Sequence, residues 1–108
     1  MSIVEQGSNG NWRYWKFNSG LAICYFSGNV NVEISQTLGS FYYGDYLSEY
    51  PLTFTTYPAV STTSAWGGLV SFSNNSDSKT TMEIRFIATY NIGAATPVLG
   101  AVAIGMWK

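Results

Sequence analysis

The sequence predicts an all-β domain, an antiparallel β-sandwich of jelly-roll-like character with about seven or eight strands. Clusters of Gly, Asn, Ser and Thr separate short runs rich in Val, Ile, Thr and aromatic residues. Two segments, residues 30–35 and 79–90, alternate between apolar and polar side chains, which is the period of a half-buried strand. No segment keeps the apolar period of an amphipathic helix. At 108 residues the chain fits one domain.

The N-terminal part is predicted to be a polar segment followed by a hairpin. Residues 1–11 are a polar lead-in, within which residues 7–11 form a flexible link, and the sandwich domain occupies residues 12–108. Two strands, residues 12–17 and 21–27, are joined by a tight turn at Asn18, Ser19 and Gly20. Glycine suits the last turn position because it adopts a positive φ without steric cost.

The middle of the chain alternates between predicted strands and loops. Residues 38–50 hold four tyrosines and two glycines, and we expect them to form an irregular aromatic loop. Residues 51–63 are expected to be a strand with a kink at Pro58, since proline belongs at sheet edges or bends. Residues 66–74 are expected to form a further strand. In the strand at 30–35, one face carries Val30, Val32 and Ile34.

The last third contains two predicted strands separated by a Gly/Ala loop. Residues 74–78 are a polar turn, and the strand at 79–90 places Met82, Ile84, Phe86, Ala88 and Tyr90 on one face. Residues 98–107 are apolar on both faces, and such a strand needs cover on both sides. We assign the bulkier register to the core of the chain, namely Val98, Val102, Ile104 and Met106. The other register is assigned to a subunit interface, namely Leu99, Ala101, Ala103 and Trp107.

The composition favours a binding protein. The chain has four Trp, eight Tyr and six Phe, more aromatic side chains than a small domain readily buries. Tyr and Trp are enriched where proteins contact partners. Oligomerisation would hide part of such a surface. With a net charge of −1 and scattered cations, the chain lacks the basic field that nucleic-acid binding needs. The absence of histidine removes the commonest acid–base group in catalysis.

The sequence also limits the compartment. Cys24 is the only cysteine, so no disulfide forms within the chain, which fits synthesis in a reducing compartment. Residues 1–5 have neither the basic start nor the apolar run of a signal peptide. No segment has the length and apolar character of a membrane span. We therefore expect no membrane insertion.

Three segments together resemble the C-terminal head domains of tailed-phage tail fibres and related receptor-binding proteins. Residues 10–25 (GNWRYWKFNSGLAICY) are similar to the hairpin that opens many such domains. Residues 50–60 (YPLTFTTYPAV) resemble their Pro-bounded strand, and residues 103–108 (AIGMWK) their terminal motif. The order of the segments also matches. The chain departs from the pattern at Met106, where a basic residue is common, and in the Tyr-rich segment 41–50.

This resemblance implies a homotrimer in the virion, as part of a tail fibre or baseplate, made in the bacterial cytoplasm. It implies attachment to a glycan or protein on a bacterial surface, without an enzymatic step. Residues 1–11 would then connect the domain to a stalk. Two alternatives from other classes remain: a stand-alone lectin or carbohydrate-binding module, and a small enzyme.

The best ligand-binding candidates are aromatic. Tyrosine offers a flat apolar face for sugar C–H groups and a hydroxyl for polar contacts, and an aspartate accepts hydrogen bonds from sugar hydroxyls. A Trp followed by two glycines allows close approach of a ligand to the backbone. The alternative is that the tyrosines pack beneath the loop or across a subunit interface. The predicted binding residues are Tyr42, Tyr43, Asp45, Tyr46 and Trp66.

Catalysis and metal binding have little support in the sequence. Asp45 and Glu49 are the one carboxylate pair near predicted ligand-facing aromatics, and a glycosidase needs two such groups. Cys24 has no histidine to act as its base. The oxygen-rich residues Asn74, Asn75 and Asp77 are typical of a turn. We expect no catalytic residues, no metal site and no cofactor.

Overall fold

The computed structural model describes residues 2–65, 70–73 and 78–108, and it confirms the predicted all-β antiparallel fold. These residues contain no helix, and therefore no helix that is long and apolar enough to cross a membrane. The strands of the described residues are β1 (Ile3–Asn9), β2 (Trp12–Phe17), β3 (Leu21–Asn29), β4 (Val32–Ile34), β5 (Gln36–Leu38), β6 (Phe41–Glu49), β7 (Ala59–Ala65), β8 (Val70–Ser73), β9 (Thr81–Ala88), β10 (Gly93–Ala95) and β11 (Val98–Met106).

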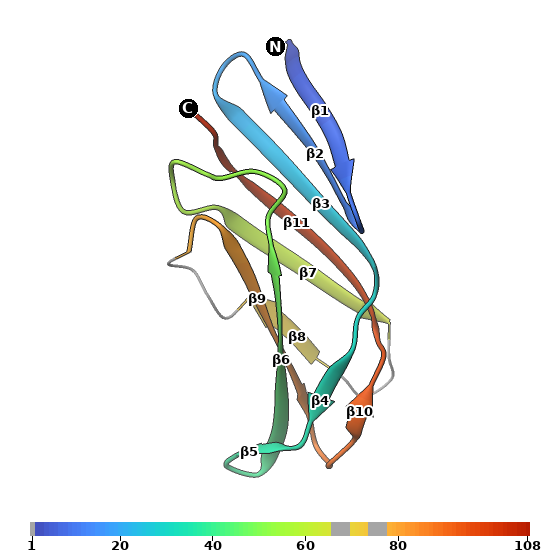
Figure 1. Ribbon diagram of the computed structural model, residues 1–108. Helices are drawn as coiled ribbons and strands as arrows, with labels where there is room; N and C mark the ends of the chain where they lie inside the picture. Colours follow the sequence, from blue (N-terminus) through green and yellow to red (C-terminus); the bar gives the residue numbers. More distant parts are fainter. Residues whose placement is uncertain (1, 66–69, 74–77) are drawn as a thin grey trace.

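Two larger sheets form the body of the molecule. One has the strand order β1-β2-β3-β11-β7, the other has the order β5-β6-β9-β8, and β4 pairs with β10 in a small third sheet. The molecule is elongated, with extents of 46 × 23 × 17 Å. Figure 1 shows β1, β2 and β3 at one end of the long axis, the end at which both termini lie. At the opposite end lies the hairpin of β5 and β6.

The core lies between the two larger sheets, as the alternation in the sequence predicts. In β9 every second residue is buried, beginning with Met82. Trp12 of β2 meets the rings of Phe26 and Tyr50 edge-on, with centroid distances of 5.2 and 5.5 Å. Such edge-to-face contacts add to the stabilisation that comes from burying large rings. The buried face of β9 carries Met82, Ile84, Phe86 and Ala88, while Tyr90, beyond the strand, is exposed.

The predicted hairpin at the start of the domain is also confirmed. β2 and β3 pair antiparallel, and Gly20 in the turn between them has a φ of 99°. The C-terminus docks on this turn. The backbone N–H of Trp107 donates to the Gly20 carbonyl at 2.8 Å, and its indole N–H donates to the Phe17 carbonyl at 2.8 Å.

The flexible link predicted at residues 7–11 is wrong for residues 7–9. These residues belong to β1, which pairs with β2 along its length. Every residue of β1 is exposed, so polar side chains cost nothing there, and the backbone hydrogen bonds to β2 hold the strand at the edge of the sheet. The stalk connection at residues 1–11 stays a prediction.

The predicted loop at residues 38–50 is wrong as well. Most of it is β6, a strand that pairs with β5 on one side and with β9 on the other. Tyr and Phe favour strands, and two neighbouring strands satisfy the backbone. Gly44 permits the close crossing of β4, because a Cβ at this position would overlap the carbonyl oxygen of Glu33.

Other strand limits differ in detail. The strand expected at 51–63 begins only after Pro58, as β7, and the strand expected at 66–74 is seen as β8. Residues 66–69 and 74–77 lie outside the described residues. Most of the turn predicted at residues 74–78 therefore lies outside them as well. The Gly/Ala loop before the last strand contains the short β10.

The two faces of β11 are exchanged relative to our expectation. Leu99, Ala101 and Ala103 are buried inside the chain, so they do not form a surface for another subunit. The opposite face is turned to solvent, where Val98 and Ile104 are 42% and 43% exposed.

Side-chain volume explains this exchange. Large rings pack around the buried face of β11, and the positions beside them are small, since Ala101 pairs with Phe26 and Gly105 lies against Phe54. A Cβ at Gly105 would come to 2.8 Å from the ring of Phe54. A closely packed core must match large side chains with small ones, so bulk alone is a poor guide to burial. Trp107, which we assigned to the interface, is half-buried and packs against the core.

Candidate functional site

The outer face of the four-stranded sheet carries a cluster of Tyr43, Asp45 and Arg85. Asp45 in β6 lies directly opposite Arg85 in β9. Arg85 donates from Nε to Asp45 Oδ1 at 2.8 Å and from Nη2 to Oδ2 at 3.0 Å. Its guanidinium also lies over the Tyr43 ring, with its carbon 4.1 Å from the ring centroid. We call these three residues the Tyr43–Arg85 cluster.

The electrostatics of the cluster follow from this geometry. The hydrogen bonds to Asp45 raise the pKa of Arg85, so the guanidinium stays charged at every accessible pH. Both carboxylate oxygens of Asp45 accept from the same planar group, a fork that is stronger and more specific than a single contact. The pair is therefore a fixed feature of the surface, and it also holds the ring of Tyr43 in place.

Apolar side chains surround the cluster. Leu38 faces Phe41 across β5 and β6, and Phe72 of β8 faces Arg85. These positions share the outward face with Tyr43 and Asp45 because alternate residues of a strand point the same way. The exposed apolar residues of this face are Leu38, Phe41, Leu47, Val70 and Phe72. An exposed apolar area around fixed polar groups is typical of a contact surface.

The remaining predicted tyrosines do not join the cluster. Tyr42 and Tyr46 lie on the other face of β6, where they are half-buried and pack against the core. The ring of Tyr46 stands 5.9 Å from that of Phe26. Trp66 lies outside the described residues. The structure thus brings two of the predicted residues, Tyr43 and Asp45, together on the surface, and it turns two others inward.

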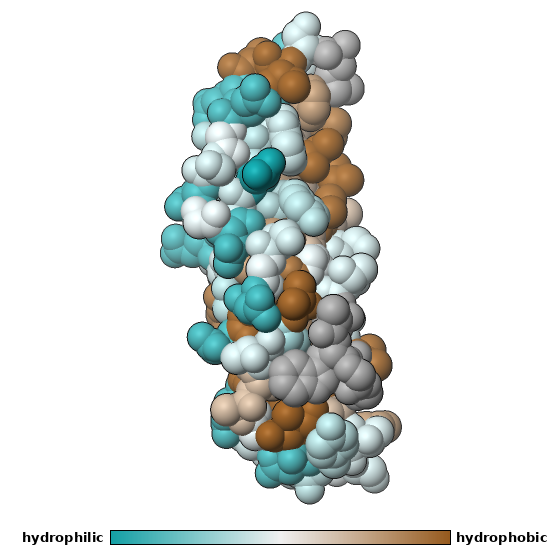
Figure 2. Space-filling model, turned by 90° about the vertical axis from the view of Figure 1, so that its right-hand side faces the viewer, coloured by the Kyte–Doolittle hydropathy of each residue, from teal (hydrophilic) through white to brown (hydrophobic). Residues whose placement is uncertain are grey.

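The hydropathy of the surface is uneven. In the view of Figure 2, hydrophobic residues gather along one edge, mainly in the upper half, whereas hydrophilic residues dominate the opposite edge. On the five-stranded sheet, the apolar residues of the outward face pair across strands, Ile104 with Ile23 and Val102 with Tyr25. We define the outer stripe as Ile23, Val98, Val102 and Ile104.

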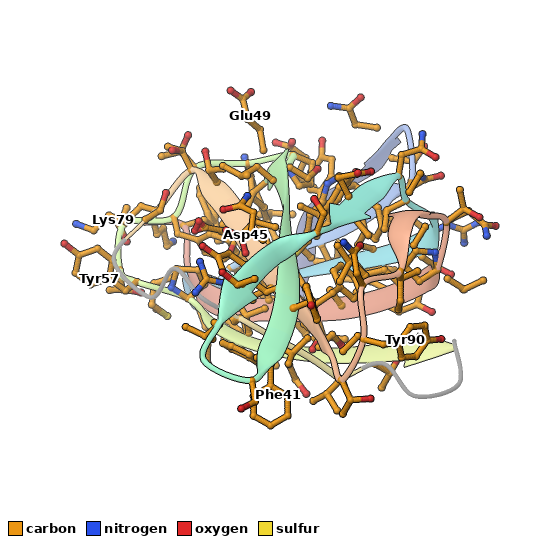
Figure 3. The ribbon with its side chains drawn as sticks, turned by 90° about the horizontal axis from the view of Figure 1, so that it is seen from below. Phe41, Asp45, Glu49, Tyr57, Lys79 and Tyr90 are labelled. Atoms are coloured by element: carbon orange, nitrogen blue, oxygen red, sulfur yellow. The ribbon has the colours of Figure 1, made fainter. Side chains whose placement is uncertain are left out.

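The possible catalytic groups are poorly placed. Asp45 and Glu49 are four residues apart on β6, about 13 Å along an extended strand, which exceeds the spacing of glycosidase carboxylates. Figure 3 shows Glu49 extending from the body of the molecule, away from Asp45. Burial raises the pKa of the Cys24 thiol to about 12, which leaves it protonated at neutral pH. Within the described residues no three Cys, Asp or Glu side chains converge as metal ligands would.

Sequence reasoning missed Arg85 and the apolar residues of β5 and β8. The alternation in 79–90 does place Arg85 on the outward face. The sequence does not reveal the register of β6 against β9, which sets Arg85 opposite Asp45, forty positions earlier. Opposite charges at outward positions of two strands would have been the available signal.

Comparison with known proteins gives a match of fold. No protein-family model and no curated protein matches the chain. Among solved structures, a C-terminal fragment of the R1 pyocin fibre of P. aeruginosa aligns with 94% of the chain, at a TM-score of 0.66 and 18% identity. An N-truncated R1-type pyocin tail fibre aligns with the same share, at a TM-score of 0.66 and 19% identity.

The two matches differ in how much of the solved structure they cover. The chain spans 28% of the length of the first fibre fragment and 84% of the second. The similarity extends over nearly the whole chain. It confirms the fold that the resemblance to tail-fibre head domains implied.

Proposed function

We propose that the chain is a tail-fibre-type receptor-binding domain, which attaches a phage or phage-derived particle to a bacterial surface. The observation that carries the proposal is the match of fold, since 94% of the chain aligns with pyocin tail-fibre structures. Fold alone does not establish function, so the surface must supply further support. The receptor is a glycan or a protein of the bacterial surface, and the domain binds it without cleaving it.

The Tyr43–Arg85 cluster is the proposed contact surface. Tyr43 presents an aromatic edge and a hydroxyl, and the Asp45–Arg85 pair presents fixed charges. Because these side chains already hold one another, they lose little conformational entropy when a partner binds. Exposed Phe41 and Phe72 supply apolar area beside them. Interfaces gain most of their energy from such central aromatic and Arg residues.

The second part of the proposal is that the domain works as a homotrimer in the virion. The outer stripe is the surface on which a copy would pack. It lies on regular strands of the five-stranded sheet, and Ile104 is 43% exposed in the isolated chain. Burial of such residues in a cyclic assembly would remove apolar surface that a soluble monomer exposes at a cost.

The experiment that tests the proposal is binding of the fluorescently labelled domain to a panel of bacterial strains. We expect saturable binding to a subset of strains. Treatment of these cells with protease or with periodate separates a protein receptor from a glycan receptor. Absence of saturable binding on every strain, with a folded and correctly assembled protein, would contradict the proposal.

A further inference from the structure

A polar groove of about 690 Å³ lies on the five-stranded sheet, on the side of β1, β2 and β3. Its volume falls within the range of ligand sites in proteins, about 300–1,000 Å³. The groove is separate from the Tyr43–Arg85 cluster, which lies on the other large sheet. It borders the outer stripe, because Trp15 pairs with Ile23 and Tyr25 pairs with Val102. The residues of its lining that point outward from these strands are Gln6, Ser8, Arg13, Trp15, Tyr25 and Ser27.

Strand register places these side chains in rows on one face. Ser8 of β1, Arg13 of β2 and Tyr25 of β3 are direct neighbours across the three strands. Gln6 and Trp15 form the next row. This face is the outward one, because the alternate residue of β2, Trp12, is buried in the core. Three regular strands therefore hold the groove, and the strands fix the positions of its side chains.

The charge of the groove is positive. Among the described residues that line it, Arg13 alone is charged. The guanidinium is exposed, and within the described residues it takes part in neither an ion pair nor a hydrogen bond. The carboxylate of Glu5 is engaged elsewhere, since it accepts hydrogen bonds from Tyr14 and Lys16. Arg13 thus keeps its donors available for an anionic group.

We propose that this groove binds an acidic saccharide. The acidic group, a carboxylate or a phosphate, would receive paired hydrogen bonds from Arg13, the geometry for which a guanidinium is suited. Trp15 and Tyr25 flank Arg13 and offer apolar ring faces for sugar C–H groups. Gln6, Ser8 and Ser27 offer amide and hydroxyl groups that match sugar hydroxyls. The inference rests on the proposed function in that the receptor includes a bacterial glycan, and it adds a second site and a ligand class.

The test is a titration of the domain with defined sugars, in which isothermal calorimetry measures the affinity. The probes are a hexuronic acid oligosaccharide, a sugar phosphate, and a neutral oligosaccharide of the same length as the first. We expect the acidic probes to bind, the neutral one to bind at least tenfold more weakly, and added salt to weaken binding of the acidic ones. The better of the two acidic probes identifies the anionic group. Equal binding of the neutral probe, or binding of no acidic probe, overturns the inference.

Variants assign the site. Arg13→Gln should weaken binding of the acidic probe about tenfold or more, because a charge-assisted hydrogen-bond pair is lost. Lys108→Gln is the matched control, since it removes one exposed positive charge outside the groove. Circular dichroism and thermal unfolding should be unchanged in both, as both side chains are exposed. If Tyr43→Ala abolishes binding of the acidic probe and Arg13→Gln does not, the groove assignment is wrong while the proposed function stands.

Failure of the proposed function gives a different result. In that case no bacterial strain would bind the labelled domain, whatever the sugar titration shows. Binding to cells without binding of any acidic probe would retain the proposed function and overturn the groove. The two sets of measurements therefore separate the two proposals.

Discussion

Arg85 and Asp45 form a two-pronged ion pair across β9 and β6, with donor–acceptor distances of 2.8 and 3.0 Å. The same guanidinium stacks on Tyr43. A single arginine therefore links an acidic and an aromatic side chain on a face that also exposes Phe41 and Phe72. This arrangement holds the side chains of the cluster in place before any partner arrives.

Replacement of Arg85 by Met should destabilise the domain modestly. Both side chains of the pair are about one-quarter exposed, at 21% and 24%, so solvent screens part of the attraction. We expect a loss of about 1 kcal/mol in the free energy of unfolding. Urea denaturation measures it. The control is a double-mutant cycle that compares Arg85→Met, Asp45→Asn and the variant with both changes. A coupling energy of zero between the two changes would show that the ion pair contributes nothing to stability.

The two faces of β11 should respond differently to a charge. Ala101→Glu places a carboxylate in the core and should unfold the domain, because an unpaired buried charge is far more costly than an exposed one. Ile104→Glu lies on the outer stripe and should keep the β-type circular dichroism spectrum while breaking the assembly. Light scattering reports the assembly. An Ile104→Glu protein that remains trimeric would place the subunit interface elsewhere.

The domain should lose stability in alkali. Burial raises the pKa of Cys24 and of Tyr50 to about 12, above their ordinary values of 9.0 and 10.0. The unfolded chain releases these protons first, so the contribution of these two groups to the free energy of unfolding should be constant below pH 9 and should fall between pH 9 and 12. Urea denaturation at a series of pH values measures this. A stability that rises over this interval would contradict the assignment.

Tyr50→Phe provides the matched variant for the alkaline prediction. The Tyr50 hydroxyl is buried without a hydrogen-bond partner among the described residues. Its removal should raise the free energy of unfolding by about 1 kcal/mol, since an unsatisfied buried group is lost. The decline above pH 10 should also become shallower. A less stable Tyr50→Phe protein at pH 7 would mean that the hydroxyl has a partner after all.

No cleavage of host polysaccharide should accompany binding. Asp45 is held by Arg85, and Glu49 is exposed and about 13 Å away along β6, so the pair lacks both the spacing and the burial that a glycosidase requires. Incubation of the domain with host polysaccharide should release no reducing sugar. Release that Asp45→Asn or Glu49→Gln abolishes would establish an enzyme instead.

Local patterns in the sequence predicted those parts of the fold that local physics determines. The hairpin at Gly20 needs only a residue that accepts a positive φ, and the buried face of β9 follows from the alternation beginning at Met82. The strand β6 escaped prediction because Gly44 interrupts it and because aromatic residues occur on both of its faces. Its partners β5 and β9 determine its conformation, and no local pattern reveals them.

Long-range packing decides the remaining features. Both registers of β11 are apolar, and the choice between them depends on the rings around the buried face, where Ala101 pairs with Phe26 and Gly105 lies against Phe54. The candidate site shows the same limit. Tyr43 and Asp45 could be selected from residue type, but their partner Arg85 depends on the register of β6 against β9.

The most direct test of the account is the affinity of Tyr43→Ala for a bacterial strain that binds the unmodified domain. We predict about a thirtyfold loss, equivalent to about 2 kcal/mol for a central aromatic contact. Tyr90→Ala is the control, since Tyr90 is an exposed tyrosine that lies apart from Asp45 (Figure 3). Tyr46→Ala should instead lower stability, because its ring packs on Phe26. Unchanged cell binding by folded Tyr43→Ala protein would contradict the claim that this surface recognises the receptor.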